Sequence, residues 1–246
     1  MDQALLWAAK AMNITTPNPR VGCIIVKHGR IIGAGHTQPA GQAHAEVQAL
    51  NDARANGHDV AGSTVYVTLE PCSHFGHTPP CVDALIAAGV KRVVVAIADP
   101  YPEVAGRGIA KLRAAGIEVI GDVRANEARE MNIGFLSRFE RGLPWVRLKL
   151  AASLDGKTAL NNGQSQWITS QAARDDGHKW RARACAILTG IGTVQADDPQ
   201  LTVRAIETPR QPRRIVVDSQ LEIDPNAKVL DGGGTWIVAA QSNPPK

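Results

Sequence analysis

The stretches His44-Ala45-Glu46 and Thr68-Leu69-Glu70-Pro71-Cys72, the second followed by Cys81, decide how this 246-residue chain folds and what it binds. One imidazole and two thiols are ligands that zinc prefers, and three protein ligands leave one tetrahedral position open. An open position is typical of a catalytic zinc site, because it binds water and lowers the pKa of that water toward neutrality. The sequence therefore predicts a zinc site with His44, Cys72 and Cys81 as its ligands.

Glu46 stands two residues after the predicted histidine ligand, where it can move protons without binding the metal. The order His-x-Glu, then Pro-Cys, then Cys is the signature of the zinc nucleobase deaminases. Their second half is usually Cys-x-x-Cys, whereas eight residues separate the two cysteines here. A structural zinc would need a fourth protein ligand, which His74 or His77 could supply, but Glu46 would then have no task.

Apolar patterning predicts strands and helices that alternate around these ligands. Strands are expected at 21–26, 31–35, 64–69, 92–98 and 117–120, and helices at 2–12, 44–56, 81–88 and 108–115. His44 and Cys81 then each open a helix, where free N–H groups favour a thiolate over a thiol. Alternating strands and helices predict an α/β domain for residues 1–142.

A second α/β block is predicted for residues 143–246. Strands are expected at 145–151, 185–189, 214–218 and 235–239, with a helix at 170–183. The segment Gly142-Leu143-Pro144 marks the predicted boundary.

Composition narrows the class of protein. A hydrophobic content of 44% with 20% charged residues is typical of a soluble globular chain, and no long apolar run predicts a membrane span. The net charge of +4 is spread along the chain and aromatic residues make up only 4%, which favours a phosphorylated small molecule over nucleic acid as the partner. Four cysteines fit metal binding in a reducing cytoplasm, and Cys23 and Cys185, in apolar runs, are expected in the core.

Longer motifs resemble a known family, the bifunctional riboflavin-biosynthesis deaminase/reductases. They are Thr16-Pro17-Asn18-Pro19-Arg20-Val21-Gly22, the stretches around Cys72 and Cys81, and residues 99–108, 148–157, 165–170 and 196–199. The resemblance implies a cytidine-deaminase-like three-layer α/β/α domain followed by a partial dihydrofolate-reductase-like α/β domain. It also implies zinc-dependent hydrolytic deamination of 2,5-diamino-6-ribosylamino-4(3H)-pyrimidinone 5′-phosphate to 5-amino-6-ribosylaminouracil 5′-phosphate. Reduction of the ribose by NADPH would follow.

The resemblance also implies roles for individual residues. It places the zinc ligands at His44, Cys72 and Cys81, the proton carrier at Glu46, cofactor contacts at Ala151, Trp167, Thr193, Asp197 and Ser219, and substrate contacts at Asn18, His74, His77, Ser165, Arg181, Leu201 and Arg204. The residues themselves support part of this assignment. The Asn18 amide can pair with the edge of a heterocycle, and Arg181 and Arg204 can bind phosphate.

Two features depart from the family pattern. His77 stands where the family has a basic residue, so its charge depends on pH near neutrality. The family's reductase domain continues beyond Lys246, and Gly232-Gly233-Gly234 precedes a predicted strand, whereas a phosphate loop follows a strand and opens a helix. We therefore expect a C-terminally truncated reductase domain with weak or no reductase activity beside an intact deaminase.

Two other functions remain open from the sequence. One is a zinc deaminase acting on another nucleobase or nucleoside, and the other is a zinc-stabilised binding module without activity. Members of the family tend to self-associate, so the resemblance also suggests a homo-oligomer.

Overall fold

The computed structural model describes residues 1–76 and 78–240, and the chain divides into two compact units, Met1–Val146 and Arg147–Lys246. Among the described residues, none of the helices has both the length and the apolar character needed to cross a membrane.

The first unit is built on a five-stranded sheet with the order β2-β1-β3-β4-β5. Its strands are β1 (Gly22–Lys27), β2 (Arg30–His36), β3 (Thr64–Val67), β4 (Arg92–Val95) and β5 (Glu118–Ile120). β1 runs antiparallel to β2 and β3, whereas β3, β4 and β5 are parallel. This difference follows from the connections, because a tight turn joins β1 to β2 while helices join the later strands.

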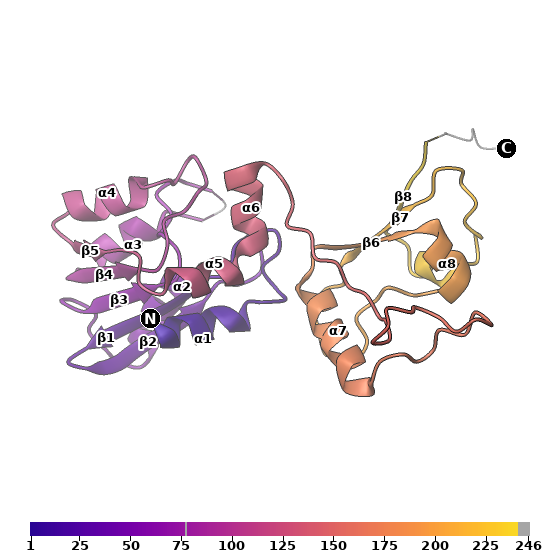
Figure 1. Ribbon diagram of the computed structural model, residues 1–246. Helices are drawn as coiled ribbons and strands as arrows, with labels where there is room; N and C mark the ends of the chain where they lie inside the picture. Colours follow the sequence, from indigo (N-terminus) through magenta and orange to yellow (C-terminus); the bar gives the residue numbers. More distant parts are fainter. Residues whose placement is uncertain (77, 241–246) are drawn as a thin grey trace. The chain divides into compact units, whose positions relative to one another are not determined.

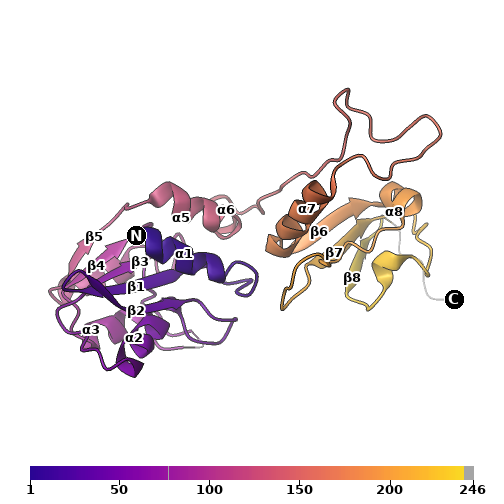
Figure 2. The same ribbon diagram turned by 90° about the horizontal axis from the view of Figure 1, so that it is seen from below.

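Helices cover both faces of this sheet (Figures 1 and 2). They are α1 (Asp2–Lys10), α2 (Ala45–Ala55), α3 (Cys81–Ala87), α4 (Arg107–Ala114), α5 (Ala125–Met131) and α6 (Ile133–Arg141). Figure 2 shows α1 and α5 on one side of the sheet and α2 and α3 on the other. The predicted three-layer α/β/α architecture is therefore confirmed, whereas α5 and α6 were not expected from the sequence.

Glycines let the helices lie directly on the hairpin of β1 and β2. A Cβ atom at Gly22 would lie 1.9 Å from the Ala4 carbonyl oxygen of α1, and one at Gly33 would lie 2.3 Å from the Ala49 carbonyl oxygen of α2. Neither contact leaves room for a methyl group. The backbone of β1 and β2 is thus held between two helices, which fixes where α2, and with it His44, begins.

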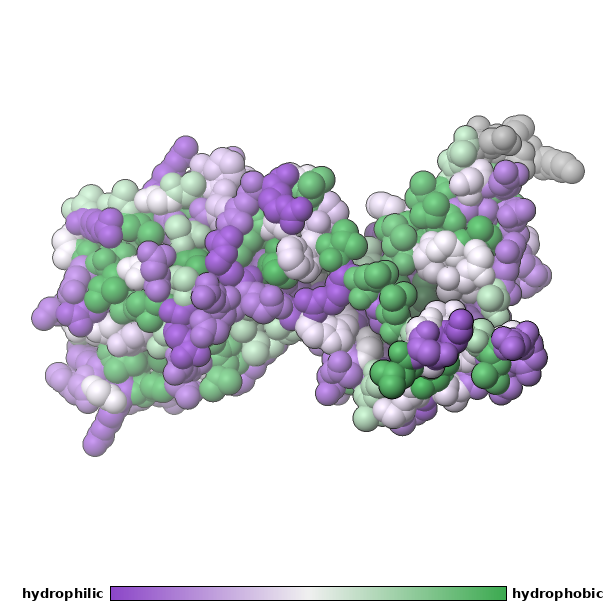
Figure 3. All heavy atoms as spheres, viewed as in Figure 1, coloured by the Kyte–Doolittle hydropathy of each residue, from purple (hydrophilic) through white to green (hydrophobic). Residues whose placement is uncertain are grey.

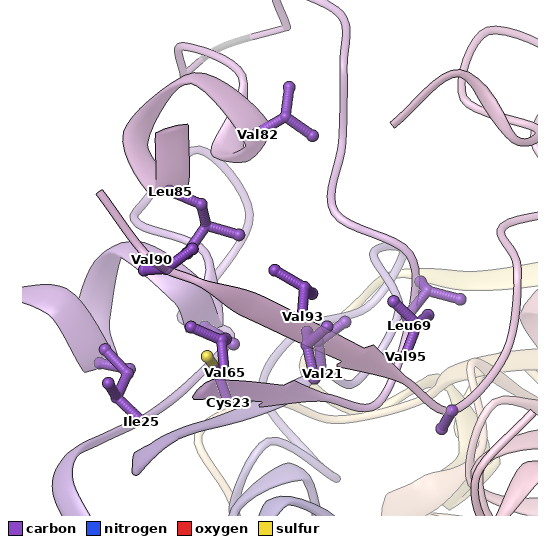
Figure 4. Close-up of a cluster of buried hydrophobic side chains, with 14 of the residues drawn as sticks. Val21, Cys23, Ile25, Val65, Leu69, Val82, Leu85, Val90, Val93 and Val95 are labelled. Carbon is purple, nitrogen blue, oxygen red and sulfur yellow. The ribbon is translucent and has the colours of Figure 1, made fainter. Parts of the chain in front are cut away.

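The core of the first unit is formed by the sheet and by the helices on both of its faces, including Leu5 of α1 and Ala128 of α5 as well as residues of α2 and α3. Figure 4 shows Cys23 and Ile25 of β1, Val65 of β3 and Val93 of β4 on the strands, with Leu85 on α3, and all five are fully buried. The predicted core position of Cys23 is therefore confirmed.

The second unit has a three-stranded parallel sheet with the order β6-β7-β8. Its elements are α7 (Gln171–Arg183), β6 (Ala186–Gly190), α8 (Ile191–Asp197), β7 (Arg213–Val217), the 3-10 helix η1 (Lys228–Leu230) and β8 (Thr235–Val238). Ser170 caps α7 by accepting a hydrogen bond from the Ala173 N–H at 3.3 Å. An α/β fold was predicted for this part of the chain and is confirmed.

Two predictions for the second unit are wrong. The segment 145–151 is not a strand, and the apolar side chains of Val146 and Leu148 within it are each 79% exposed. Alternating apolar residues favour an extended chain, but a strand also needs a hydrogen-bonded neighbour, which this segment lacks in the described structure. Cys185 is exposed rather than buried, because it precedes β6, a strand whose side chains alternate between exposed and half-buried.

Candidate metal centre and active site

The three predicted zinc ligands lie together at one end of the first sheet. His44 is the residue on which α2 begins, and Cys81 is the first residue of α3. Cys72 lies in the segment that leaves β3, and its carbonyl oxygen accepts a hydrogen bond of 3.2 Å from the Val82 N–H. The eight residues between the cysteines therefore form a loop that returns to the start of α3.

The ligand atoms are close enough to share one ion. His44 Nδ1 lies 3.3 Å from Cys81 Sγ and 3.5 Å from Cys72 Sγ, and all three ligand atoms lie within 4.8 Å of one another. A tetrahedral zinc with bonds of about 2.3 Å to sulfur and about 2.0 Å to nitrogen would hold its ligand atoms roughly 3.5–3.8 Å apart. Two sulfurs and one imidazole nitrogen also suit zinc chemically, so the site fits this metal.

None of the described residues occupies the fourth position of this site. Among the described residues, no further histidine, cysteine or acid joins the group of His44, Cys72 and Cys81. His74 is therefore not a fourth ligand, and His77 lies outside the described residues. An open position is the arrangement expected of a catalytic site.

Contacts among the three ligand side chains shift their pKa values. The Cys81 side chain hydrogen-bonds Cys72 and, with a further contribution from His44, lowers the pKa of the Cys72 thiol to about 4. The same contact raises the pKa of Cys81, and the hydrogen bond to Cys72 raises the pKa of His44. Since the pKa of Cys81 is raised, a bound cation would have to displace the proton of its thiol.

Glu46 lies in the first turn of α2, and its side chain is only 3% exposed. Burial, helped by the negative charge of Cys72, raises the pKa of its carboxyl group to about 7. The neighbouring His44 and Cys81 oppose this shift in part. A buried acid that titrates near neutrality beside a metal site is suited to both accepting and donating protons.

Further groups form the surroundings of the metal ligands. His74 lies in the loop between the cysteines, and its buried Nδ1 has no hydrogen-bond partner among the described residues. The centre of its ring lies 5.6 Å from that of Tyr101, in an edge-on arrangement. Asp99 is 8% exposed, accepts a hydrogen bond of 2.8 Å from the Tyr101 N–H, and has its pKa raised to about 6 by burial. Neither Asp99 nor Tyr101 was predicted as a site residue, and the only signal in the sequence is the Asp99-Pro100 turn.

Asn18 lies at the same end of the sheet. It is half-buried in the turn before β1, and its N–H donates to the Thr15 carbonyl at 2.7 Å. β1 starts beside the end of β3, since the Gly22 N–H donates to Thr68 Oγ1 at 3.0 Å, and β3 leads on to Cys72. The sheet therefore brings the turn that carries Asn18 and the segment that carries Cys72 to one edge.

In the second unit, one hydrogen bond joins a predicted substrate residue to a predicted cofactor residue. Ser165 Oγ donates to Asp197 Oδ1 at 3.2 Å, which ties the 165–168 turn to the end of α8. Thr193 also lies on α8, which follows β6, and Ser219 follows β7. Because β6 and β7 are parallel, these residues lie at the carboxyl edge of the sheet, where α/β proteins bind ligands.

Arg181 and Arg204 are brought together around two shared acceptors. Both donate to the Thr202 carbonyl, at 2.9 and 3.4 Å, and both bond His178 Nδ1, through the Arg181 guanidinium at 3.1 Å and the Arg204 backbone N–H at 3.2 Å. Leu201 precedes this segment and is half-buried at φ 55°. His178 was not predicted as a site residue.

The other predicted cofactor residues lie in irregular segments of the second unit. Ala151 is half-buried, and Trp167 is 69% exposed with the Arg174 guanidinium 4.5 Å from its ring centre. Trp167 also lines a hollow with Ser153, Lys157 and Ser165.

Comparison with known proteins agrees with both units. Residues 1–97 match the cytidine and deoxycytidylate deaminase zinc-binding region, and residues 144–246 match the RibD C-terminal domain. The riboflavin biosynthesis protein RibD of Escherichia coli is 50% identical over 99% of this chain and 69% of its own length. The chain belongs to the RibD family. The RibD protein of Aquifex aeolicus is also 50% identical, over 94% of this chain and 64% of its own length.

Solved structures of RibD proteins agree with the family assignment. RibD of Acinetobacter baumannii superposes with a TM-score of 0.90 at 44% identity, over 98% of this chain and 73% of that chain. The Thermotoga maritima diaminohydroxyphosphoribosylaminopyrimidine deaminase/5-amino-6-(5-phosphoribosylamino)uracil reductase superposes with a TM-score of 0.91 at 40% identity, over 97% of this chain and 68% of that chain. A zinc deaminase domain and a RibD reductase-type domain, the latter in a family that uses NADPH, are therefore both present, and they assign the chain to riboflavin biosynthesis.

Proposed function

We propose that residues 1–142 catalyse the hydrolytic deamination of 2,5-diamino-6-ribosylamino-4(3H)-pyrimidinone 5′-phosphate, with zinc held by His44, Cys72 and Cys81. The observation that carries this proposal is the convergence of these three ligand atoms within 4.8 Å beside the buried carboxyl group of Glu46. The deaminase/reductase named for the Thermotoga maritima relative supports this substrate class.

Glu46 moves the protons in this proposal. Zinc, when bound, supplies a water molecule whose pKa is lowered toward neutrality. In the metal-free chain, burial raises the pKa of the Glu46 carboxyl group to about 7, which suits an acid that must exchange protons near neutral pH. It can therefore accept a proton from the attacking water and donate it to the ring nitrogen. It can then accept the proton of the hydroxyl group left on the ring carbon and donate it to the amino group, which leaves as ammonia.

Polar groups at the same edge of the sheet bind the substrate in this proposal. The Asn18 amide offers a donor and an acceptor to the edge of the pyrimidine. The Nδ1 of His74, which has no partner among the described residues, hydrogen-bonds a polar group of the substrate in this proposal. His77, outside the described residues, stays a predicted contact for the phosphate.

The test compares ammonia release from the diaminopyrimidine phosphate with release from cytidine and from guanine. Bound zinc per chain is measured on the same sample. One zinc per chain with release from the diaminopyrimidine phosphate alone supports the proposal. Release from cytidine or guanine instead would favour the alternative nucleobase deaminase, and zinc binding without any release would favour a binding module.

We propose for residues 143–246 a part in NADPH-dependent ribose reduction. Two contacts support it: Ser165 with Asp197, and Arg181 with Arg204 around His178. The first joins a predicted substrate residue to a predicted cofactor residue, and the second gathers positive charge suited to the substrate phosphate. NADPH oxidation in the presence of the deaminated product tests this role, and the weak reductase activity predicted from the sequence stays a prediction until that assay.

We propose further that the substrate is a free phosphorylated pyrimidine and not nucleic acid. We also propose that the protein works in a reducing cytoplasm, because the thiols of Cys72 and Cys81 are free.

We propose that copies of the chain self-associate. Sedimentation of the purified chain at several concentrations tests self-association. A single species with the mass of one chain throughout would refute it.

A further inference from the structure

Glu70 is an acid buried next to the metal site with no part in the proton transfer described above. Its side chain is 3% exposed, and it lies two residues before Cys72. In the part of the chain that the structure describes, no lysine or arginine forms an ion pair with it. A buried carboxylate without a cation requires several hydrogen bonds in compensation.

Three backbone amides supply those hydrogen bonds. Glu70 Oε2 accepts from the Asp99 N–H at 3.1 Å and from the Gly106 N–H at 3.0 Å, while Oε1 accepts from the Ile109 N–H at 3.1 Å. One carboxylate thus fixes both ends of the 99–106 loop and the first turn of α4. All three donors lie beyond residue 97, where the match to the deaminase zinc-binding region ends.

The peptide between Glu70 and Pro71 is packed closely against Gly108 of α4. A Cβ atom at Gly108 would lie 2.1 Å from the Pro71 carbonyl oxygen and 3.1 Å from Glu70 Oε1. The start of α4 therefore lies against the Glu70-Pro71 peptide, and this peptide leads directly to Cys72. Any displacement of α4 would therefore also displace Cys72, the predicted metal ligand.

The 99–106 loop reaches the metal site at a second point. Tyr101 of this loop meets the ring of His74, which lies between Cys72 and Cys81, at 5.6 Å. Tyr101 in turn lies 5.1 Å from the ring of Phe139 on α6. The loop is thus anchored at Glu70 and packed against the segment that joins the two cysteines.

We infer that Glu70 is a positioning residue for the deaminase: its carboxylate binds the amides of Asp99, Gly106 and Ile109 and thereby holds Cys72 and the 99–106 loop in the geometry that metal binding and turnover require. The inference deepens the proposed deaminase function and rests on it for the turnover readout only. Metal affinity and the spectrum of a bound metal test Glu70 independently of any substrate.

The experiment replaces Glu70 by Gln, which keeps the size of the side chain but turns one acceptor into a donor facing an N–H group. We expect Glu70→Gln to weaken zinc binding 10- to 100-fold, as loss of outer-sphere support typically does. We expect it also to shift the visible absorption bands of the Co²⁺-substituted protein and to lower kcat for ammonia release at least tenfold. Glu70→Asp, which keeps the charge, should recover part of each loss. The matched control is Glu118→Gln on β5, an exposed acid paired with Arg92, which should change none of these values.

A purely structural role would lower the melting temperature and leave the metal readouts unchanged. A folded Glu70→Gln variant with wild-type zinc affinity, Co²⁺ spectrum and kcat would therefore overturn the inference. If the wild-type chain releases no ammonia, the proposed function fails, but the zinc and Co²⁺ measurements still decide the role of Glu70.

A second pair of variants decides the matter if Glu70→Gln does not fold. Ile109→Pro and Ile109→Ala both remove the side chain, but only proline removes the N–H that bonds Glu70. Proline is tolerated in the first turn of a helix, where Ile109 lies. Weaker zinc binding in Ile109→Pro than in Ile109→Ala supports the inference, and equal binding in the two variants overturns it.

Discussion

The backbone N–H of Cys81 donates a hydrogen bond of 3.3 Å to the Sγ of Cys72, so the helix that supplies one thiol also orients and stabilises the other. The N–H of Val82 in turn donates to the Cys72 carbonyl at 3.2 Å. Two amides at the start of α3, which a helix leaves without internal partners, are satisfied by Cys72 alone. The long spacing between the cysteines is thus compatible with one compact metal site.

This arrangement predicts different reactivity for the two thiols once metal is removed. Because hydrogen bonds lower the pKa of Cys72 to about 4 while that of Cys81 is raised, Cys72 is the thiolate of the pair at pH 6. Iodoacetamide at that pH should therefore label Cys72 before Cys81 in chelator-treated protein, as read by peptide mass spectrometry. Zinc should protect both, and the exposed Cys185 serves as the reference. Faster labelling of Cys81 would contradict the assignment.

Replacement of Glu46 by Gln should separate metal binding from turnover. The variant keeps the shape of the side chain but cannot accept and return a proton, so ammonia release should fall about 10²- to 10⁴-fold. Zinc content, measured by atomic absorption, should stay at the wild-type value. Glu118→Gln, an exposed change on the same sheet, controls for the loss of one negative charge. Turnover of Glu46→Gln within threefold of wild type would exclude Glu46 as the proton carrier.

Asp99 makes the stability of the first unit depend on pH. Burial raises its pKa from 3.8 to about 6, so the folded state binds the proton more tightly than the unfolded state. Ionisation therefore destabilises the folded state. The loss of stability is absent below about pH 4, grows between about pH 4 and 6, and is constant above that, at up to about 3 kcal/mol.

Asp99→Asn removes that cost and keeps an acceptor for the Tyr101 N–H. Urea unfolding should show the variant to be more stable than wild type at pH 8, with the difference vanishing near pH 4. A constant difference across this range would show that Asp99 does not titrate as its burial implies.

Glycine at position 22 is required by the contact between α1 and β1. Gly22→Ala would place a methyl group against the Ala4 carbonyl and should lower the free energy of unfolding by about 1–3 kcal/mol or more. Gly134→Ala on α6, where no atom lies within 4 Å, should be neutral or raise it by up to about 1 kcal/mol. Equal effects of the two substitutions in urea unfolding would argue against this packing.

Much of the first unit follows from local sequence. The β-branched and aromatic residues of Val65–Val67 predicted β3, and the β-branched run Val93–Val95 predicted β4, because such residues favour strands. The helices after them were predicted from the apolar spacing of residues such as Val82 and Leu85. The helix α5 was missed because its apolar contacts to α1 come from a distant part of the chain, and no local pattern reports that neighbour.

The candidate site was predictable where chemistry restricts the residue type. Few functions other than zinc binding use a histidine, a glutamate and two cysteines in the order of His44, Glu46, Cys72 and Cys81. The pattern alone therefore predicted that these residues would lie together. Glu70 and Asp99 are buried and accept hydrogen bonds from backbone amides. Every residue except proline has such an amide, so the residue types in the sequence do not predict these contacts. The extended segment 145–151 shows the converse error, since alternation there predicted a strand that has no neighbour to pair with.

X-ray absorption at the zinc edge of the metal-loaded chain shows whether one imidazole and two sulfurs hold a zinc ion with one position left to solvent. We expect two sulfur neighbours at about 2.3 Å and two nitrogen or oxygen neighbours at about 2.0 Å, one of which disappears in His44→Ala. A shell with a second histidine in place of the solvent ligand, or one without two sulfurs, would refute this zinc site.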